Sequence, residues 1–564
     1  MKRVFVLMGI LLFAACAREG SVHFKALNKQ AAREYLTPVR PGVPGGQPFW
    51  NVYSTKFTFA PAFDFPEAAG AEKYRFDLWY LDNLWREIYL PVPEKRPSAK
   101  AQLEKYSATS EPVASFTATS PKADLSPVWG KLPEGYYGLV VTAVDASGQD
   151  IAPVGTWEFL RVFPFCGPYP EPVRSYRDAA LMALWFNHRQ PLVQKIHDWD
   201  PDTLYESENV FANKFIGSVI SSEVLMAQQI PSYRDECLEN ARKAADLLIS
   251  LAQPEGTPLA HFPPTYYDSQ ILAGKARNDT RIGGTTVSDL QEMTMTLDAL
   301  HAVRGYLNLY DFCGERKYFD EAIAILRTYD RLVDSTGFMP KKLYIKTGEG
   351  VNGAGALSGN LLTVIRRLRK QYDIRDFDGL ADRCERWMNE NAIRDFHMSA
   401  QFEDVSIDQH PYQNLTNITP NVYARYLLEK ETVSQEDLTV ATDLLHFVED
   451  QFIHWGLPRN ADGMFYCNVP GVYEQYSCRI SIDSSNDAYI NASLSMYDRT
   501  GDRLWYEKAR ALMNTVVNSQ AVTGEIPTFM GLQYGAPNRY FWINCSLRSA
   551  QTLLRFAEYE ERLD

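Results

Sequence analysis

The stretch Tyr233-Arg-Asp-Glu-Cys-Leu-Glu-Asn-Ala-Arg-Lys-Ala-Ala-Asp-Leu-Leu248 shows the pattern that dominates this chain. An aromatic residue stands where a helix would begin, and Ala and Leu follow at helical spacing. The pattern returns in Tyr318-Phe-Asp-Glu-Ala-Ile-Ala-Ile-Leu326 and in Tyr506-Glu-Lys-Ala-Arg-Ala-Leu-Met513, with weaker copies beginning near Phe377 and Leu438. Such recurrence predicts an architecture built from repeated helical units.

Each copy follows another apolar helix after only a few residues. Gly and Asp stand in the connections, as in Tyr310-Asp-Phe-Cys-Gly-Glu315 and Tyr497-Asp-Arg-Thr-Gly-Asp502, so the unit is a helical hairpin. The pattern predicts twelve helices, over residues 175–190, 209–230, 233–251, 288–312, 317–334, 355–372, 377–391, 419–430, 434–453, 486–499, 503–519 and 544–559. Five hairpins form directly, and the last helix can pair with the first to close a sixth.

From about Arg174 onward the chain therefore resembles the six-hairpin glycosidase superfamily. That superfamily has an (α/α)6 toroid shared by many glycoside hydrolases, polysaccharide lyases and some sugar epimerases. The resemblance covers about two thirds of the chain and is architectural, without a diagnostic motif of one enzyme family. It implies an all-α catalytic domain that acts on glycans. An open helical solenoid used for binding is the alternative, and it predicts short loops of roughly equal length.

The loops are unequal in length. Connections within hairpins are short, and the long ones fall between hairpins, at residues 191–208, 252–287, 335–354, 392–418, 454–485 and 520–543. Because long and short loops alternate, a closed ring would place all the long ones on one face. Long ordered loops are seldom retained for connection alone, so we expect the functional site on that face.

The region from about Phe49 to Phe165 has strand-like periodicity. Lys73-Tyr-Arg-Phe-Asp-Leu-Trp-Tyr80 and Gly138-Leu-Val-Val-Thr-Ala-Val144 carry β-branched and aromatic residues in partial alternation. Residues 132–145 resemble the penultimate strands of an immunoglobulin or fibronectin type III module. We expect an all-β sandwich that serves as a spacer or packing unit, with sugar binding as the alternative.

The N-terminus has the features of a secretory leader. Lys2 and Arg3 precede the apolar run Val4–Ala15, which is too short to span a bilayer. The segment Leu12-Phe13-Ala14-Ala15-Cys16 resembles a bacterial lipobox, which implies lipidation at Cys16. A plain signal peptide with an incidental Cys16 is the alternative.

These features give a multidomain organisation. We expect a lipoprotein signal peptide at 1–15, a tether at 16–46, an Ig-like β-sandwich at 47–168 and an (α/α)6 toroid catalytic domain at 169–564. The expected location is the bacterial cell envelope, with the membrane reached through the N-terminal lipid anchor only.

The composition and motifs of the sequence limit the binding partners and cofactors that we expect. Lys and Arg number 57 and Asp and Glu 70, a net charge of −13. An acidic surface repels phosphate backbones, so nucleic acid is not an expected partner.

The sequence has no GxGxxG after a strand, no P-loop and no GxSxG elbow. Its His residues are dispersed, so we expect no cofactor and no metal. A calcium ion held by loop Asp residues stays open.

Glycosidic hydrolysis needs one carboxylic acid and one carboxylate. Asp404 and Asp408 form the first candidate pair, because apolar neighbours in residues 402–412 could desolvate a carboxyl group and raise its pKa. Asp483 lies at a helix start, where capping is an equally good explanation. Asp487 lies one turn from Asn491 on a face that would look into the ring, and Glu525 stands in a turn. Further candidates are Glu206, Glu208 and Asp289.

The long loops are also rich in side chains suited to sugars, because aromatic faces stack on pyranose rings. The expected substrate-binding residues are His261, Tyr267, His410, Tyr412, Trp455, Tyr473, Arg479 and Trp542. If Arg459, Arg479, Arg539 and Lys341 converged, they would pair with a uronate or sulfate.

A uronate substrate would allow a second type of reaction, β-elimination. In β-elimination by a lyase, His410 with Tyr412, or His261 with Tyr266, would be base and acid. The sequence thus predicts a glycoside hydrolase acting on a poly- or oligosaccharide. The alternatives are a polysaccharide lyase, a sugar epimerase, and a non-catalytic carbohydrate-binding surface lipoprotein.

Overall fold

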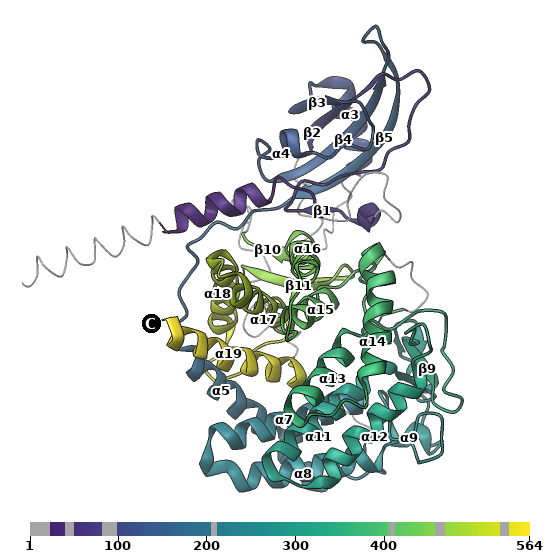
Figure 1. The fold of residues 1–564 in the computed structure, drawn as a ribbon, viewed down its shortest axis with the longest axis vertical. Coiled ribbons are helices and arrows are strands. Elements are labelled where there is room, and N and C mark those ends of the chain that lie inside the picture. The colour runs from purple at the N-terminus through teal and green to yellow at the C-terminus, as the bar shows by residue number, and fades with distance from the viewer. Residues whose placement is uncertain are drawn as a thin grey trace, which may run out of the picture.

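The computed structural model describes residues 23–39, 50–81, 99–204, 211–403, 405–406, 412–456, 469–530 and 541–563. A sheet built from the N-terminal part of the chain lies beside a ring of helices (Figure 1). Over these ranges, no helix combines the length and the apolar character needed to cross a membrane.

Helices of the C-terminal two thirds form two concentric layers. Each helix of the inner layer packs against the next, and the last packs against the first. The inner helices are α7 (Ala212–Gln229), α11 (Ala299–Cys313), α13 (Gly359–Tyr372), α15 (Ile418–Leu428), α17 (Asp483–Thr500) and α19 (Ile543–Leu563). The outer helices are α8 (Arg234–Ser250), α12 (Arg316–Leu332), α14 (Asp378–Trp387), α16 (Gln435–Phe452), α18 (Arg503–Ser519) and α5 (Tyr176–His188). Because α19 pairs with α5, the ring closes. The predicted (α/α)6 toroid is confirmed.

The predicted helices agree with the observed ones to within four residues at each end, with one exception. The helix expected over 288–312 begins only at Ala299. The residues before it form the short helix α10 (Val287–Leu290), the strand β8 (Met293–Met295) and a 3-10 turn, Thr296–Asp298. The strand forms because β8 pairs with β9 (Lys342–Tyr344) from the next long loop. Apolar spacing alone does not distinguish such a strand from a helix.

Two glycines of the quoted connections end inner helices in the same way. Gly314 has φ +74° and Gly501 has φ +67°, and their N–H groups donate to the carbonyl oxygens of Tyr310 and Tyr497. A left-handed residue ends a helix at low cost when it is glycine. These tight turns join inner to outer helices, so each long loop leads into the N-terminus of an inner helix. The expectation that the long loops gather on one face is confirmed.

The long loops contain short helices and strands. They are α6 (Pro191–Gln194), α9 (Ser269–Leu272), β6 (Arg281–Ile282), β7 (Thr285–Thr286), β10 (Ile453–His454), β11 (Gly471–Gln475), β12 (Cys478–Ser481) and the π-helical turn Met388–Ile393. β10, β11 and β12 form a three-stranded sheet.

The N-terminal region contains one five-stranded sheet. Its order is β1 (Lys56–Phe57), β5 (Asp150–Arg161), β4 (Gly135–Val144), β2 (Lys73–Leu81) and β3 (Ala114–Ala118). Only β1 and β5 pair in parallel. On one face, Trp79 and Leu81 pack against Leu103 of helix α3 (Ala99–Thr109).

The expectation of two packed sheets is not met within the described residues of this region. The opposite face of the sheet, including Phe76 and Tyr137, faces a core of aromatic side chains from Phe57, Phe63 and Trp129, the last of which is in α4 (Ser126–Trp129). The strand signals of the sequence were therefore correct, but a helix and irregular segments, rather than further strands, cover the two faces.

Residues 23–34, expected to be part of a tether, form a helix. Leu27, Ala31 and the following Tyr35 are buried. Tyr35 donates to Glu449 of α16 at 2.6 Å, and Lys508 of α18 donates to Glu34 at 3.3 Å and to Glu449 at 2.7 Å. This part of the predicted tether is packed on the outer ring, because its apolar stripe finds a surface to bury against.

Candidate functional site

The long-loop cavity is a hollow of about 100 Å³ where the N-terminal ends of the inner helices meet. All six inner helices contribute to its wall. The polar residues of the wall include Lys214, Asp298, His301, Arg304, Asn360, Gln401, Glu403, Thr419, Glu474, Ser484, Asn544 and Arg548. The cavity lies on the face where the loops are long, as the sequence predicts.

Asp298 is the first carboxyl group of the cavity. It ends the 3-10 turn before α11, and its Oδ2 accepts a hydrogen bond from the Thr265 hydroxyl at 2.9 Å. Burial and the nearby Glu403 charge raise its pKa to about 7, against the lowering effect of Lys214. Asp298 therefore holds a proton over a pH range in which an ordinary aspartate has lost it.

Glu403 is the second carboxyl group, and its side chain is buried. Lys214 of α7 donates to its Oε1 at 2.5 Å, and the Tyr266 hydroxyl donates to its backbone oxygen at 3.1 Å. Burial alone would lower the pKa of Lys214, but the Glu403 and Asp298 charges outweigh burial and raise that pKa. The Lys214 ammonium thus pairs with a Glu403 carboxylate.

His301, Arg304 and Arg548 form the inner end of the cavity. Burial, and then the charges of Arg548 and Arg304, hold the pKa of His301 well below its usual value. The imidazole is therefore neutral near pH 7. One cavity thus brings together a protonated acid, a carboxylate paired with an ammonium, and a neutral imidazole, which are groups able to give or take protons.

The predicted catalytic residues do not line this cavity where the structure describes them. Asp483 and Asp487 are 0% and 2% exposed, and Ser549 of α19 donates to Asp487. Burial between helices, rather than access to substrate, explains their raised pKa values. Glu525 is half-buried in a turn outside the cavity wall. Asp404 and Asp408 lie outside the described residues.

Most predicted sugar-binding residues that are described have structural contacts away from the cavity. The ring nitrogens of His261 contact Glu321 and Glu255 at 3.0 and 2.6 Å. Tyr267 donates to the Pro201 carbonyl and Tyr412 to the Asp395 carbonyl, while Trp455 is buried and donates to Glu449. Tyr473 is also buried, with its ring 4.2 Å from that of His454.

Trp542 is the exception, because the Lys214 ammonium lies 5.1 Å from its ring centre. It therefore contacts the wall of the long-loop cavity through Lys214, while its ring also lies 5.4 Å from that of Phe211.

Of the remaining candidates, two have structural contacts and the others lie outside the described residues. Lys341 donates to the Ala400 carbonyl, and Asp289 accepts from Thr286 at the start of α10. Outside the described residues lie Cys16, Glu206, Glu208, His410, Arg459, Arg539 and the side chain of Arg479.

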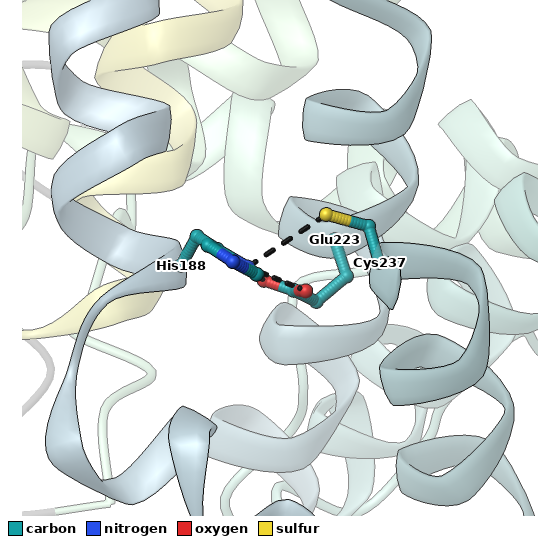
Figure 2. A group of neighbouring side chains, drawn as sticks. All are labelled: His188, Glu223 and Cys237. Carbon is teal, nitrogen blue, oxygen red and sulfur yellow. Dashed lines mark hydrogen bonds and ion pairs between the residues drawn. The ribbon is translucent and has the colours of Figure 1, made fainter. Parts of the chain in front are cut away.

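A buried group of three side chains lies elsewhere in the ring. His188 of α5, Glu223 of α7 and Cys237 of α8 point toward one another (Figure 2). His188 Nδ1 lies 3.0 Å from Glu223 Oε2 and 3.7 Å from Cys237 Sγ, and Asn240 donates to Glu223 at 3.0 Å. The three atoms are spaced closely enough to hold a metal ion. Burial raises the pKa of the Cys237 thiol, which disfavours the thiolate form that binds metals. The ion pair between His188 and Glu223 therefore explains why these side chains lie together without a metal ion.

The closed ring and the carboxyl pair define the class of this protein as an (α/α)6 toroid with a polar cavity that holds carboxyl groups on its long-loop face. No protein-family model matches the sequence, and no curated protein matches it. Several solved structures are similar at low identity. A family 76 glycoside hydrolase from a bovine Bacteroides thetaiotaomicron strain aligns over 86% of this chain and 93% of its own, with 11% identity and a TM-score of 0.44.

Two further solved structures align over 68% of this chain. A D-mannose isomerase aligns over 97% of its own length, with 12% identity and a TM-score of 0.46. An unsaturated glucuronyl hydrolase from Streptococcus agalactiae aligns over 91% of its length, with 10% identity and a TM-score of 0.42. Similarity at this level transfers neither an activity nor a residue role, so the site is judged on its own chemistry.

Proposed function

We propose that this protein is a glycoside hydrolase in which Asp298 and Glu403 are the two catalytic carboxyl groups. The observation that carries the proposal is that both groups line one cavity in different surroundings. Burial raises the pKa of Asp298 to about 7, and Lys214 forms an ion pair with Glu403. A carboxylic acid beside a carboxylate is the pairing that glycosidic cleavage needs.

The environments assign a role to each group. Asp298 is the general acid that protonates the leaving glycosidic oxygen, because it lines the cavity and burial raises its pKa to about 7. Glu403 is the nucleophile or the base that activates water. Lys214 donates to its Oε1, and the Trp542 ring beside Lys214 offers a surface on which a sugar can stack.

The experiment uses the full chain and a panel of glycans and nitrophenyl glycosides. Asp298→Asn should abolish cleavage of glycans, whose leaving groups need a proton, and spare more of the activity on nitrophenyl glycosides, whose leaving groups do not. Glu403→Gln should abolish both activities. Asp279→Asn and Glu292→Gln are matched controls, since both side chains are exposed. Full activity of both Asp298→Asn and Glu403→Gln would overturn the proposal.

His301 supports a second candidate function. A neutral imidazole beside Arg304 and Arg548 could abstract a proton next to a carbonyl or carboxylate group, which is the chemistry of a sugar epimerase or a polysaccharide lyase. His301→Asn should then abolish turnover, and the product would be an epimer or an unsaturated, ultraviolet-absorbing sugar. Binding of glycans without any product would instead indicate a carbohydrate-binding protein.

A further inference from the structure

The short-loop cavity extends from the inner end of the long-loop cavity toward the other end of the ring and measures about 880 Å³. Its wall comes from inner helices, including α11, α13, α17 and α19. None of the expected catalytic or sugar-binding residues that the structure describes lines it. A volume of this size accommodates a small molecule rather than a single ion.

Positive charge is concentrated on this wall. Six cationic side chains line the cavity, against one carboxylate, Glu429, so the lining carries 6 − 1 = +5. The whole chain, in contrast, has a net charge of −13. The six cations are Arg304, Arg366, Arg367, Lys370, Arg499 and Arg548.

Two of these cations are neutralised within the protein. Arg366 forms an ion pair with Glu429, and Arg367 donates to Asp311 at 2.8 Å. Glu429 is also engaged by Arg425 at 2.7 Å and by Arg555 at 3.7 Å. The one carboxylate of the wall is therefore already occupied.

The other four cations have no carboxylate partner among the described residues. Arg304 donates to the side-chain oxygen of Asn360, and Arg499 donates to two backbone carbonyls. Lys370 is exposed. Burial and the neighbouring Arg548 lower the pKa of Arg304 to about 10, as expected where positive charges are close together and not neutralised.

We propose that the short-loop cavity binds a small polyanion carrying at least two phosphate or sulfate groups. Guanidinium groups hold such oxyanions through paired hydrogen bonds. The surplus of four cations, distributed over α11, α13, α17 and α19, exceeds what one singly charged group would neutralise.

The two cavities share part of their walls. His301, Arg304, Asn544 and Arg548 line both, so a bound polyanion would lie next to the inner end of the long-loop cavity. The binding site itself does not depend on the proposed hydrolase function, since it shares neither Asp298 nor Glu403.

Isothermal titration calorimetry of the full chain at low ionic strength tests the proposal, with inorganic pyrophosphate, orthophosphate and a disulfated disaccharide as probes. We expect pyrophosphate or the disaccharide to bind at least tenfold more tightly than orthophosphate, and binding to weaken with added salt. The double variant Lys370→Gln and Arg499→Gln, which removes two of the four cations without a carboxylate partner, should reduce affinity at least tenfold.

A second variant and a matched control keep the result interpretable. Lys370→Gln alone removes an exposed charge and should reduce affinity about threefold without affecting folding. The double variant Arg316→Gln and Lys317→Gln removes two exposed charges from the outer helix α12 and should bind within twofold of wild type. Tighter binding of the disaccharide than of pyrophosphate would assign a sulfated sugar, and the reverse a phosphate compound. No binding of any probe, or an equal loss in the control, would overturn the proposal.

Discussion

Asp298 shows how one environment can turn an ordinary side chain into a candidate acid. Burial and the Glu403 charge raise its pKa to about 7, while the Thr265 hydroxyl fixes one of its oxygens. The raised pKa has a direct consequence, because the acid works only while it is protonated.

We expect kcat/KM of the wild-type protein on glycans to fall as pH rises through about 7, since Asp298 then loses its proton. A pH profile between 5 and 9, measured in parallel on Glu292→Gln as a control, checks this. A profile that stays flat to pH 9 would contradict the role of Asp298 as acid.

The position of Asp298 in the cavity wall does not follow from the sequence. The apolar spacing over residues 288–312 continues without a visible break, so the sequence predicts Asp298 inside a helix. Glu403 stands next to Asp404, which the sequence favours as a catalytic candidate. Pairing of β8 with β9 and contact of Lys214 with Glu403 join residues distant in sequence, and no local pattern records such contacts.

His188 gives a prediction about stability. Burial alone would lower its pKa, but the hydrogen bond and charge of Glu223 outweigh burial and raise it. The ion pair therefore stabilises the fold fully below the unfolded-state value of about 6.5, and its contribution is lost as pH rises through the higher folded-state pKa.

We expect His188→Gln to lower the free energy of unfolding by about 3 kcal/mol at pH 5.5, because it leaves Glu223 buried without its charged partner, and by less at pH 9. Urea denaturation at both pH values measures the difference. Glu236→Gln is the control, since Glu236 is 53% exposed and lies 3.5 Å from His188. An equal loss at both pH values would show that the imidazole is neutral in the folded protein.

At the scale of elements, the helical hairpins were predictable because their apolar residues recur with one period and their connections end in glycine. The segments that cover the two faces of the sheet, and the helix over residues 23–34, were not predictable from the sequence. Both depend on surfaces supplied by distant segments, such as Leu103 against Trp79 and Tyr35 against Glu449.

The helix over 23–34 contacts a buried ion pair that joins α16 to α18. Lys508 and Glu449 have side chains that are 0% exposed, and Glu34 also accepts from Lys508. We expect Lys508→Met to reduce the free energy of unfolding by about 3–5 kcal/mol, because Glu449 would remain buried and charged.

Urea denaturation checks this expectation against Arg316→Met, which breaks an exposed ion pair on α12 and should cost under about 0.5 kcal/mol. Adding Glu449→Gln to Lys508→Met should recover part of the loss. Equal midpoints and slopes for Lys508→Met and wild type would contradict a stabilising role for the pair.

At the scale of the whole molecule, the sheet and the ring are joined by buried contacts. Asp450 at the end of α16 accepts from the backbone N–H groups of Thr58 and Phe59 at 2.6 and 2.8 Å. Lys56 in turn donates to the Asp450 carbonyl at 2.8 Å. The N-terminal region is thus attached to the same outer helix that receives the helix over 23–34.

Lipidation at Cys16 remains a proposal that rests on the leader sequence. We expect the full chain, produced in a bacterium that processes lipoproteins, to partition into Triton X-114, and Cys16→Ser to stay in the aqueous phase. Cys166→Ser is the control, because that cysteine is exposed and lies outside the lipobox-like segment. Detergent partitioning of Cys16→Ser like that of wild type would contradict the proposal.

The packed helix over 23–34 has a consequence for how such an anchored protein would work. Only residues 17–22 separate Cys16 from the folded body, and a fully extended chain covers about 3.5 Å per residue. The start of this helix in an acylated protein would then lie within about 25 Å of the bilayer surface, so the lipid anchor would hold the outer helices α16 and α18, on which the helix packs, close to the membrane.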